Sequence, residues 1–220
     1  MLSQAVEDYL KVIYKLRPEG LASTTEVARA LGVSSASVTN MAKRLDELGL
    51  VQYQSYKGVR LTEAGTKVAL EIIRHHRLLE LYLREVMGYS WEHIHEEAEH
   101  LEHHISEEFE AKIEEMLGYP THDPHGDPIP TRDGRIEEAA MDALAQAMVG
   151  ERLVVRRVSD EDPQLLTYLE SIGLLPTMTL RVTKKAPFDG PITVQTTEGE
   201  HVLGFSVANH IFVGPSELAG

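Results

Sequence analysis

Carboxylate and imidazole side chains are concentrated in one stretch of the chain, Trp91–Phe109, which reads WEHIHEEAEHLEHHISEEF. If this stretch is one helix, an apolar stripe lies beside a face of potential metal ligands. The ligands on that face, which covers about one third of the circumference, are His95, Glu99, Glu102 and His103. Oxygen and imidazole ligands together suit Mn²⁺, Fe²⁺ or Zn²⁺. We therefore expect a metal site here, the alternative being a solvated charged face.

A second pair of potential ligands, His76 and Glu80, lies on the preceding predicted helix, Glu63 to about Met87. Residues spaced i, i+4 share one helix face, so the pair is either a surface interaction or two metal ligands. A tight turn follows, and antiparallel packing would bring this pair towards the ligands of the next helix. The apolar faces of both helices exceed what a small neighbouring domain can cover, which predicts a homodimer interface.

The chain before these helices predicts a winged helix-turn-helix. Apolar residues recur at helical spacing in three segments, and two β-like segments then flank the turn SYKG. The expected helices are 3–16, 26–31 (capped by Thr24 and Thr25) and 35–48, and the expected strands are 50–53 and 59–61. A short helix, a turn with Gly and a helix rich in Ser, Thr and Asn are typical of DNA readers. The alternative is a winged helix that contacts only proteins.

Small polar residues at the start of the third helix allow its backbone to approach the major groove, and nearby basic residues suit phosphate contacts. The candidate DNA-binding residues, including two on the hairpin, are Ser34, Ser35, Ser37, Thr39, Asn40, Lys43, Arg44, Lys57 and Arg60. Residues 1–77 hold 11 Lys and Arg against 8 Asp and Glu (net +3), and the rest hold 10 against 27 (net −17), which together give −14. A mildly basic head suits DNA, and an acidic body suits cations.

Composition and missing motifs narrow the class of protein further. The chain has no Cys, which excludes disulfides, thiolate zinc sites and a catalytic cysteine. It shows neither a leader pattern nor a long apolar run, so we expect a cytoplasmic protein without a membrane partner. The metalloprotease, α/β-hydrolase and phosphate-loop motifs are missing, and both Glu-x-x-His matches lie on one predicted helix. We therefore expect no enzyme.

The pattern changes in the second half of the chain. Residues 117–134 are rich in Pro and Gly and predict an irregular linker, and a short helix is expected over Arg135–Met148. After Gly150 we expect a small, mostly β domain. Its strands are expected at 153–158, 179–183, 192–195 and 211–213, with a short helix at 165–172 and an acidic loop at 160–162.

Several motifs together resemble one known family, over nearly the whole chain. They are VEDYLKVIYKL, the winged helix, RHHRLLELYL, HIHEEAEHLEHHIS and HGDPIP. On these motifs the chain is similar to the diphtheria-toxin-repressor-like metalloregulators, including their manganese-responsive branch. The resemblance implies a mainly α fold with a small β domain. Its parts would be a winged helix-turn-helix (1–62), a helical dimerisation and metal-binding domain ending in the linker (63–134), and an SH3-like, FeoA-type C-terminal domain (135–220).

The resemblance also implies two metal sites in each subunit. The primary site would consist of Asp8, Glu99, Glu102 and His103. The ancillary site would consist of His76, Glu80 and His95 with an acceptor from the C-terminal domain, Asp160 or Glu161. Because the primary set has carboxylates and no sulfur, it favours Mn²⁺, with Fe²⁺ as the alternative.

One position departs from the compact, two-metal manganese regulators of this family. They carry a second acid one turn after the first, where this chain has Lys11. A charged lysine cannot ligate a metal and repels a nearby cation, which argues against a closely spaced metal pair here.

The expected function is a metal-dependent repressor that binds a palindromic operator in double-stranded DNA as a homodimer and controls metal-uptake genes. Metal would join the DNA-reading head to the helical body and fix the dimer in its DNA-binding geometry. The alternatives are an iron-dependent regulator of the same family, a metal-buffering protein, and a DNA-binding regulator that senses something other than metal.

Overall fold

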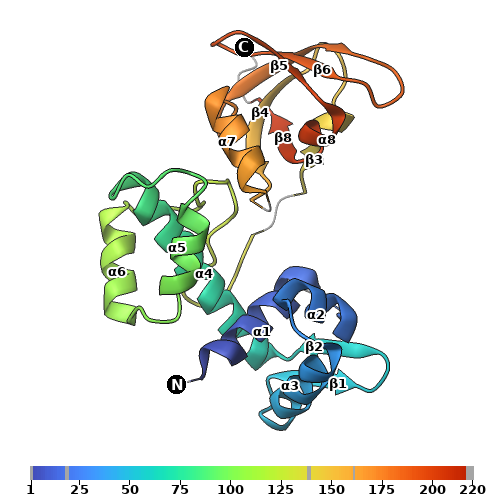
Figure 1. Ribbon diagram of the computed structural model, residues 1–220. Helices are drawn as coiled ribbons and strands as arrows, with labels where there is room; N and C mark the ends of the chain where they lie inside the picture. The colour runs from blue at the N-terminus through green and yellow to red at the C-terminus, as the bar shows by residue number, and fades with distance from the viewer. Residues whose placement is uncertain (1, 18–19, 138–139, 161, 217–220) are drawn as a thin grey trace. The chain divides into compact units, whose positions relative to one another are not determined.

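The structure is a computed structural model that describes residues 2–17, 20–137, 140–160 and 162–216. The chain divides into two compact units, and Figure 1 labels the helices and strands along it. The first unit comprises residues 1–76, 99–112 and 129–137, and the second comprises residues 77–98, 113–128 and 138–220. The architecture confirms the expected fold class, mainly α with one small β domain.

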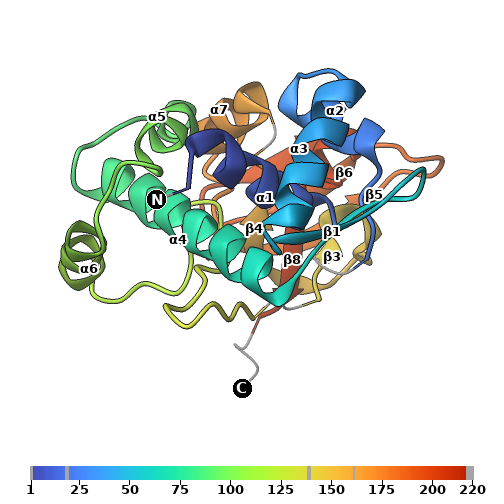
Figure 2. The ribbon, with the colours of Figure 1, turned by 90° about the horizontal axis from the view of Figure 1, so that it is seen from below.

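The first unit contains the expected winged helix-turn-helix. Its elements are α1 (Gln4–Leu16), α2 (Thr24–Leu31), α3 (Ser35–Glu47), the hairpin β1 (Val51–Gln54) and β2 (Gly58–Leu61), and the first half of α4 (Glu63–Glu85). Their apolar faces share one core, which includes Leu10 of α1, Leu45 of α3 and Ile73 of α4. Figure 2 shows α1 alongside α4. This packing places the first turns of α1 near the middle of α4.

The start of α2 corrects one expectation from the sequence. The helix begins at Thr24, and its N-cap is Ser23 in place of the predicted Thr24 or Thr25. Ser23 Oγ accepts a hydrogen bond from the Glu26 backbone N–H (3.2 Å), and the Glu26 carboxylate accepts one from the Ser23 N–H (2.9 Å). This reciprocal capping box satisfies two backbone donors at once, which neither threonine would do from inside the helix.

The β1–β2 hairpin, which forms the wing, is anchored to the turn that precedes α2. Ala22 and Val59 exchange backbone hydrogen bonds of 2.8 and 2.9 Å, so that Ala22 adds a bridge to the β1–β2 hairpin. Gly58 has a φ of +132°, and a Cβ there would lie 2.3 Å from the Ala22 carbonyl oxygen. Only glycine therefore allows the hairpin to approach the helix-turn-helix so closely.

The stretch Trp91–Phe109 is not one continuous helix, which corrects the sequence expectation. Helix α5 spans Ile94–Leu101, turns follow, and α6 spans Glu107–Met116. Ser106 Oγ accepts a hydrogen bond from the Phe109 N–H (3.2 Å) and so caps the second helix. Because a Ser side chain competes for backbone donors, it starts a new helix there and interrupts the old one. Glu102 and His103 therefore lie just beyond the end of α5.

Buried charges hold α6 against α4 within the first unit. The Arg74 guanidinium pairs with the Glu110 carboxylate and donates a hydrogen bond to the Pro130 carbonyl at 2.7 Å. His75 Nε2 lies 3.3 Å from Glu110 Oε2. Although burial alone would raise it, the pKa of Glu110 is lowered to about 2 by His75 and Arg74. This ion-pair network fixes the middle of α4, from which potential metal ligands project.

The second unit contains a six-stranded antiparallel sheet in the order β3-β8-β4-β5-β6-β7. The strands are β3 (Asp142–Ala143), β4 (Arg152–Val158), β5 (Thr179–Lys185), β6 (Ile192–Gln195), β7 (Glu200–Leu203) and β8 (Ile211–Pro215). The helical segments between these strands are η1 (Leu144–Gln146), α7 (Pro163–Ser171) and α8 (Phe205–Ala208). The four predicted strands and the predicted helix are present, whereas β3, β7 and α8 were not foreseen.

The helix expected over Arg135–Met148 is wrong for the described part of that segment. Asp142 and Ala143 pair with Val213 and Phe212 of β8, and the 3₁₀ turn η1 follows. Leu144 is fully buried. The local sequence has high helix propensity, but pairing with the sheet edge and burial of Leu144 outweigh that weak preference. Among the described residues, no helix is both long and apolar enough to cross a membrane.

Candidate metal centres and DNA-binding surface

A first cluster of metal-ligating side chains lies in the first unit. His103 Nε2 is 2.8 Å from Asp8 Oδ1 and 3.2 Å from Glu102 Oε1. One ligand atom from each of these residues falls within 4.8 Å of the others. The His103 Nε2 atom is buried and makes no hydrogen bond to any described residue. A buried imidazole nitrogen that faces two carboxylates without bonding to them has the arrangement that a divalent cation needs.

Glu7 orients the His103 ring, a role that sequence reasoning missed. The Glu7 carboxylate lies 2.7 Å from His103 Nδ1 and can accept a hydrogen bond from its N–H. That hydrogen bond leaves the lone pair of Nε2 directed at Asp8 and Glu102, as carboxylates do for metal-binding histidines. The only signal in the sequence was a second acid beside Asp8, which a first-turn preference for acids explains equally well.

Glu99 and His76 adjoin this cluster through Glu102. His76 Nδ1 is 2.6 Å from Glu102 Oε2 and 3.9 Å from Glu99 Oε1. His76, Glu99 and Glu102 thus form a second group whose ligand atoms lie within 4.8 Å of one another. The resemblance assigned His76 to the ancillary site, and its Nδ1 also lies beside Glu102 of the primary set.

Lys11 lies inside the same cluster. Its Nζ is 2.6 Å from Glu99 Oε1 and 2.6 Å from Glu102 Oε1, and the side chain is 5% exposed. Burial alone would lower the pKa of Lys11, but the adjacent carboxylates raise it above its usual value, so the ammonium stays charged. Burial raises the pKa of Asp8, and the charges of His103 and Lys11 oppose this effect only in part.

A second cluster surrounds the loop that the sequence suggested was a linker. Asp123 Oδ1 accepts hydrogen bonds from the backbone N–H groups of His125 (2.8 Å) and Asp127 (2.9 Å). At Gly126, with a φ of +90°, a Cβ would lie 2.0 Å from the Arg156 carbonyl oxygen. The loop therefore packs directly on β4, and its polar groups are held in fixed positions.

His125 is fully buried in this loop, and its ring stacks on Trp91 with 5.1 Å between ring centroids. Neither ring nitrogen has a hydrogen-bond partner among the described residues. Burial lowers the pKa of His125, which favours the neutral imidazole that binds metals. A buried imidazole without partners is costly unless a ligand supplies one.

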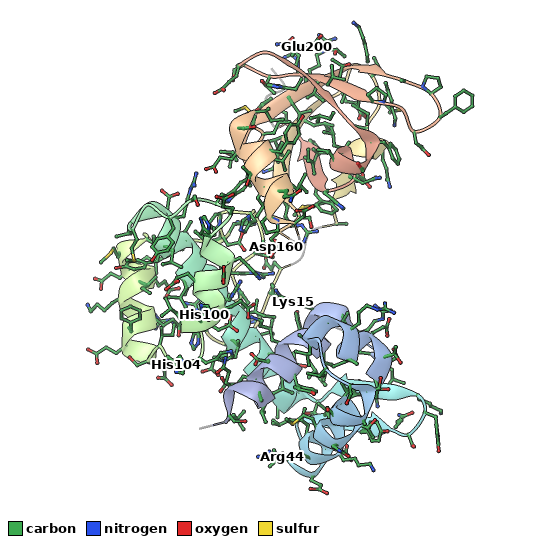
Figure 3. All side chains as sticks on the ribbon, in the orientation of Figure 1. Lys15, Arg44, His100, His104, Asp160 and Glu200 are labelled. Atoms are coloured by element: carbon green, nitrogen blue, oxygen red, sulfur yellow. The ribbon has the colours of Figure 1, made fainter. Side chains whose placement is uncertain are left out.

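Acidic groups on three segments of the second unit act electrostatically on His125. The negative charges of Glu80 on α4, Asp127 in the loop and Asp160 after β4 all act on it. Glu80 is buried and its Oε1 lies 3.1 Å from Nδ1 of His95, which α5 carries. Asp160, labelled in Figure 3, is half-buried.

Sequence reasoning included Glu80, His95 and Asp160 in its ancillary set and left out Asp123 and His125. The missed signal was the pattern His-Asp-Pro-His-Gly-Asp within the Pro/Gly-rich segment. The other predicted acceptor, Glu161, lies outside the described residues.

The predicted DNA-binding residues lie on α3, at its N-cap and on the hairpin, and most of them are exposed. All except Thr39 are exposed, namely Ser34, Ser35, Ser37, Asn40, Lys43, Arg44, Lys57 and Arg60. Ser34 is also the N-cap of α3 and accepts a hydrogen bond from the Ser37 N–H at 3.1 Å. The Thr39 hydroxyl donates to the Ser35 carbonyl within the helix (2.9 Å). Ser34 and Thr39 therefore have local structural roles in addition to the predicted one.

We expect Arg44→Ala to weaken binding to DNA of any sequence. Arg44 (Figure 3) is exposed on α3, where a guanidinium suits phosphate contacts. Loss of one such contact should reduce the slope of log K against log salt by about one. Fluorescence anisotropy at several salt concentrations measures this slope. Arg152→Ala, an exposed arginine of the C-terminal sheet, is the control, and an unchanged slope for the Arg44 variant would contradict the assignment.

Known families match the chain over three successive regions. Residues 1–59 match the iron dependent repressor N-terminal DNA-binding domain, residues 62–131 match the iron dependent repressor metal-binding and dimerisation domain, and residues 143–215 match the FeoA domain. The iron-dependent repressor IdeR of Mycobacterium tuberculosis is 31% identical over 91% of this chain and 92% of its own length. The HTH-type transcriptional regulator MntR of Geobacillus kaustophilus is 37% identical over 54% of this chain and 84% of its own length.

A solved structure, described as a manganese-dependent transcriptional repressor in complex with manganese, superposes with a TM-score of 0.87. It is 39% identical and covers 95% of this chain and 99% of its own. The winged helix, the ligand clusters and these likenesses define a metal-dependent transcriptional repressor. The chain belongs to the iron-dependent repressor family.

Proposed function

We propose that this protein is a manganese-responsive repressor that binds a palindromic operator as a homodimer and controls genes for metal uptake. One observation carries the proposal. Asp8 comes from α1 of the DNA-binding head, whereas Glu102 and His103 follow α5, and the three form one cluster within the first unit. A cation held by this cluster would connect the DNA-reading helices to the metal-binding segment.

The chemistry of the donor set supports a divalent cation of intermediate hardness. A bound ion of this kind supplies positive charge that carboxylates from both elements can share. Asp8, Glu99 and Glu102 offer oxygen, and His103 offers nitrogen, so the set has no sulfur. Carboxylate-rich sites favour Mn²⁺ over softer metals, with Fe²⁺ as the alternative.

The cluster also explains how metal would regulate DNA binding. Without a cation, several carboxylates face one another, and Lys11 balances only one of their charges. If metal binds the DNA-competent arrangement more tightly, DNA must tighten metal binding by the same factor. A coupling free energy of about 1–3 kcal/mol corresponds to roughly 5- to 150-fold in DNA affinity.

We propose a second, ancillary metal site in each subunit of the dimer. Its candidate ligands lie in the second compact unit and include two residues, Asp123 and His125, that the resemblance did not include. Glu80, Asp123, His125 and Asp160 are its candidate ligands, and His95 is a further one. The support is the buried His125 ring without hydrogen-bond partners among the described residues, together with nearby carboxylates. His76 lies one helical turn before Glu80 on α4 and is a candidate for either site.

The proposal further assigns residues 1–62 to DNA binding and residues 63–134 to dimerisation and metal binding. Residues 135–220 are assigned to the FeoA-type domain. This domain supplies Asp160 to the second cluster, and its α7 donates a hydrogen bond from Thr167 Oγ1 to the Glu92 carboxylate at 2.6 Å. We assign it the role of completing and covering the second site.

The function is tested by titrating metal-free protein with Mn²⁺, anaerobic Fe²⁺ and Zn²⁺ and following DNA binding at fixed salt. The probe is a duplex selected from a random library by the manganese-loaded protein. We expect the selected duplex to be an inverted repeat that binds at low free Mn²⁺ and is released by a chelator. Equal binding with a chelator present would exclude metal regulation, and activation by Fe²⁺ at lower free concentration would favour the iron alternative.

We expect Glu7→Gln to lower Mn²⁺ affinity about 10- to 100-fold, as loss of a partner that orients a metal-binding histidine does. Glutamine keeps the size of the side chain but removes the charge that fixes the His103 tautomer. Isothermal titration calorimetry at constant pH measures the affinity. Glu108→Gln, an exposed acid on α6, controls for net charge. Unchanged affinity in Glu7→Gln would show that the His103–Glu7 contact has no role in metal binding.

A further inference from the structure

The tip of the β1–β2 hairpin carries an aromatic side chain in an unfavourable backbone conformation. Tyr56 is the third residue of the turn Gln54–Lys57, which is closed by a hydrogen bond from the Lys57 N–H to the Gln54 carbonyl (3.0 Å). Its φ is +62°, a value that favours glycine or asparagine at this position of a turn. The ring is fully exposed, so packing against other described residues does not compensate for this cost.

The surroundings of Tyr56 indicate which ligand would use it. Backbone strain of this kind concentrates at functional sites, and the hairpin belongs to the region that matches a DNA-binding domain. Lys57, the next residue, is also exposed. A tyrosine offers an apolar ring and a hydroxyl donor, and the lysine offers a positive charge. Together they suit the sugars, base edges and phosphates of duplex DNA.

The hairpin is held firmly against the rest of the winged helix. The Tyr53 N–H donates a hydrogen bond to Asp46 Oδ1 of α3 (3.1 Å), and Ala22 bridges to Val59 at the base of the hairpin. Figures 1 and 2 both show the hairpin beside α3. A hairpin that is held in place at its base presents Tyr56 in a fixed position relative to α3.

The length of the hairpin matches the spacing of DNA grooves. Each of its strands has four residues, which carries the tip about 13 Å beyond the base. Half a helical turn of DNA, the separation between a major groove and the next minor groove, is about 17 Å. With α3 in the major groove, the side chain of Tyr56 would therefore enter the neighbouring minor groove.

We propose that Tyr56 reads the minor groove beside each half-site and makes the protein prefer A·T base pairs there. This inference rests on the proposed function, because it assumes that the metal-loaded dimer binds an operator. In the minor groove A·T pairs present only acceptors, to which the Tyr56 hydroxyl can donate. A G·C pair adds the guanine amino group, which projects into the space that the ring would occupy. Runs of A·T pairs also narrow the groove and bring its sugars closer to the ring.

The test uses three duplexes built from the one that the manganese-loaded protein selects. The pairs about five positions from each half-site centre, half a turn of DNA, are set to A·T, G·C or I·C. Inosine lacks the amino group of guanine, so I·C resembles G·C in the major groove and A·T in the minor groove. We expect wild-type, manganese-loaded protein to bind the A·T and I·C duplexes roughly 5- to 150-fold more tightly than the G·C duplex, the usual effect of a mismatched pair.

The Tyr56→Gly protein should bind all three duplexes alike, with about the wild-type affinity for the G·C duplex. Glycine suits the φ of this turn, so the hairpin should persist. Because the tyrosine side chain neutralises no phosphate, the slope of log K against log salt should not change, whereas Lys57→Ala should reduce it. Phe188→Gly is the matched control and should keep the A·T preference. It removes another fully exposed aromatic at a turn with a φ of +59°, in the C-terminal domain.

Two results would overturn the inference. One is wild-type protein that binds the I·C duplex no better than the G·C duplex, which would show that the minor groove is not read. The other is a folded Tyr56→Gly protein, checked by circular dichroism, that keeps the wild-type preference. Tyr56→Ala takes the place of the glycine variant if the latter does not fold. Absence of manganese-dependent binding to all three duplexes would instead refute the proposed function.

Discussion

Asp8→Ala is expected to abolish metal-stimulated DNA binding while the protein stays folded. Asp8 is the ligand that the DNA-binding head contributes to the first cluster, so its loss separates the head from any metal held by Glu102 and His103. The stimulation lost should be the full coupling, roughly 5- to 150-fold. Anisotropy titrations with and without Mn²⁺ measure it.

The fold should tolerate the Asp8 change. The Asp8 side chain is 32% exposed, so its truncation leaves no large cavity in the core. Burial also raises the pKa of Asp8, so the ionised carboxylate is not in a favourable environment without metal. Glu108→Ala is the matched control, because it removes an exposed acid outside the cluster. An equal response to metal in Asp8→Ala and wild-type protein would refute the proposed connection between head and body.

Asp123→Asn is expected to raise the melting temperature of the metal-free protein and to remove much of the stabilisation by Mn²⁺. Burial, with help from Glu80 and Asp127, raises the pKa of Asp123 well above its usual range. Asparagine is neutral, and its oxygen can still accept hydrogen bonds from the His125 and Asp127 backbone. The change therefore removes an unfavourable charge while keeping the loop intact.

Thermal melts with and without metal measure the expected changes in melting temperature. A ligand at 100 times its Kd stabilises a protein by about 2.7 kcal/mol, and each kcal/mol shifts the melting temperature by about 2–4 °C for a chain of this size. Most of that shift should disappear in the variant. Asp127→Asn is the comparison, because Asp127 pairs with Arg77 (3.3 Å) and Arg157 (3.2 Å), whereas Asp123 has, among the described residues, only a longer ion pair with Arg77 (3.7 Å). Loss of the Asp127 charge should therefore destabilise the protein. Lower metal-free stability in Asp123→Asn would contradict the argument.

The pH dependence of these melts should have a defined sign. A carboxyl group with a raised folded-state pKa binds its proton more tightly in the folded state. Metal-free wild-type protein should therefore lose stability as pH rises from the usual pKa of Asp123 through the raised one. Manganese should reverse this trend, because metal binding requires the deprotonated carboxylate. The Asp123→Asn protein should lack the metal-free decline.

Much of the fold was predictable, because the winged helix depends on local signals. Helical spacing, turns and short β segments located α1, α3 and the hairpin to within one or two residues. The errors occurred where distant residues decide the structure. Residues 142–146 have high helix propensity, but Asp142 and Ala143 pair with β8 and Leu144 is buried, which no local pattern reveals. The break between α5 and α6 depends on Ser106, whose capping role was overlooked.

The kind of chemistry at the candidate sites was predictable from the sequence, but the residues that belong to each site were less so. Density of acids and histidines pointed to α5, yet His100 and His104, labelled in Figure 3, are both exposed. His125 was missed because a Pro/Gly-rich segment suggested a linker, and only the packing of Gly126 on β4 shows that the loop is buried. The electrostatic role of Lys11 likewise required its distances to two carboxylates that lie far away in the chain.

The separation of those residues along the chain has a kinetic consequence. Lys11 is 88 and 91 residues from its two carboxylate partners, and Glu7 is 96 residues from His103. Contacts between such distant segments require the closure of long loops and tend to form late in folding. A metal that binds this cluster therefore stabilises contacts that are absent from an early transition state. Its main effect should be to slow unfolding, with little acceleration of folding. The metal-loaded protein would therefore stay folded for longer, while its folding rate would change little.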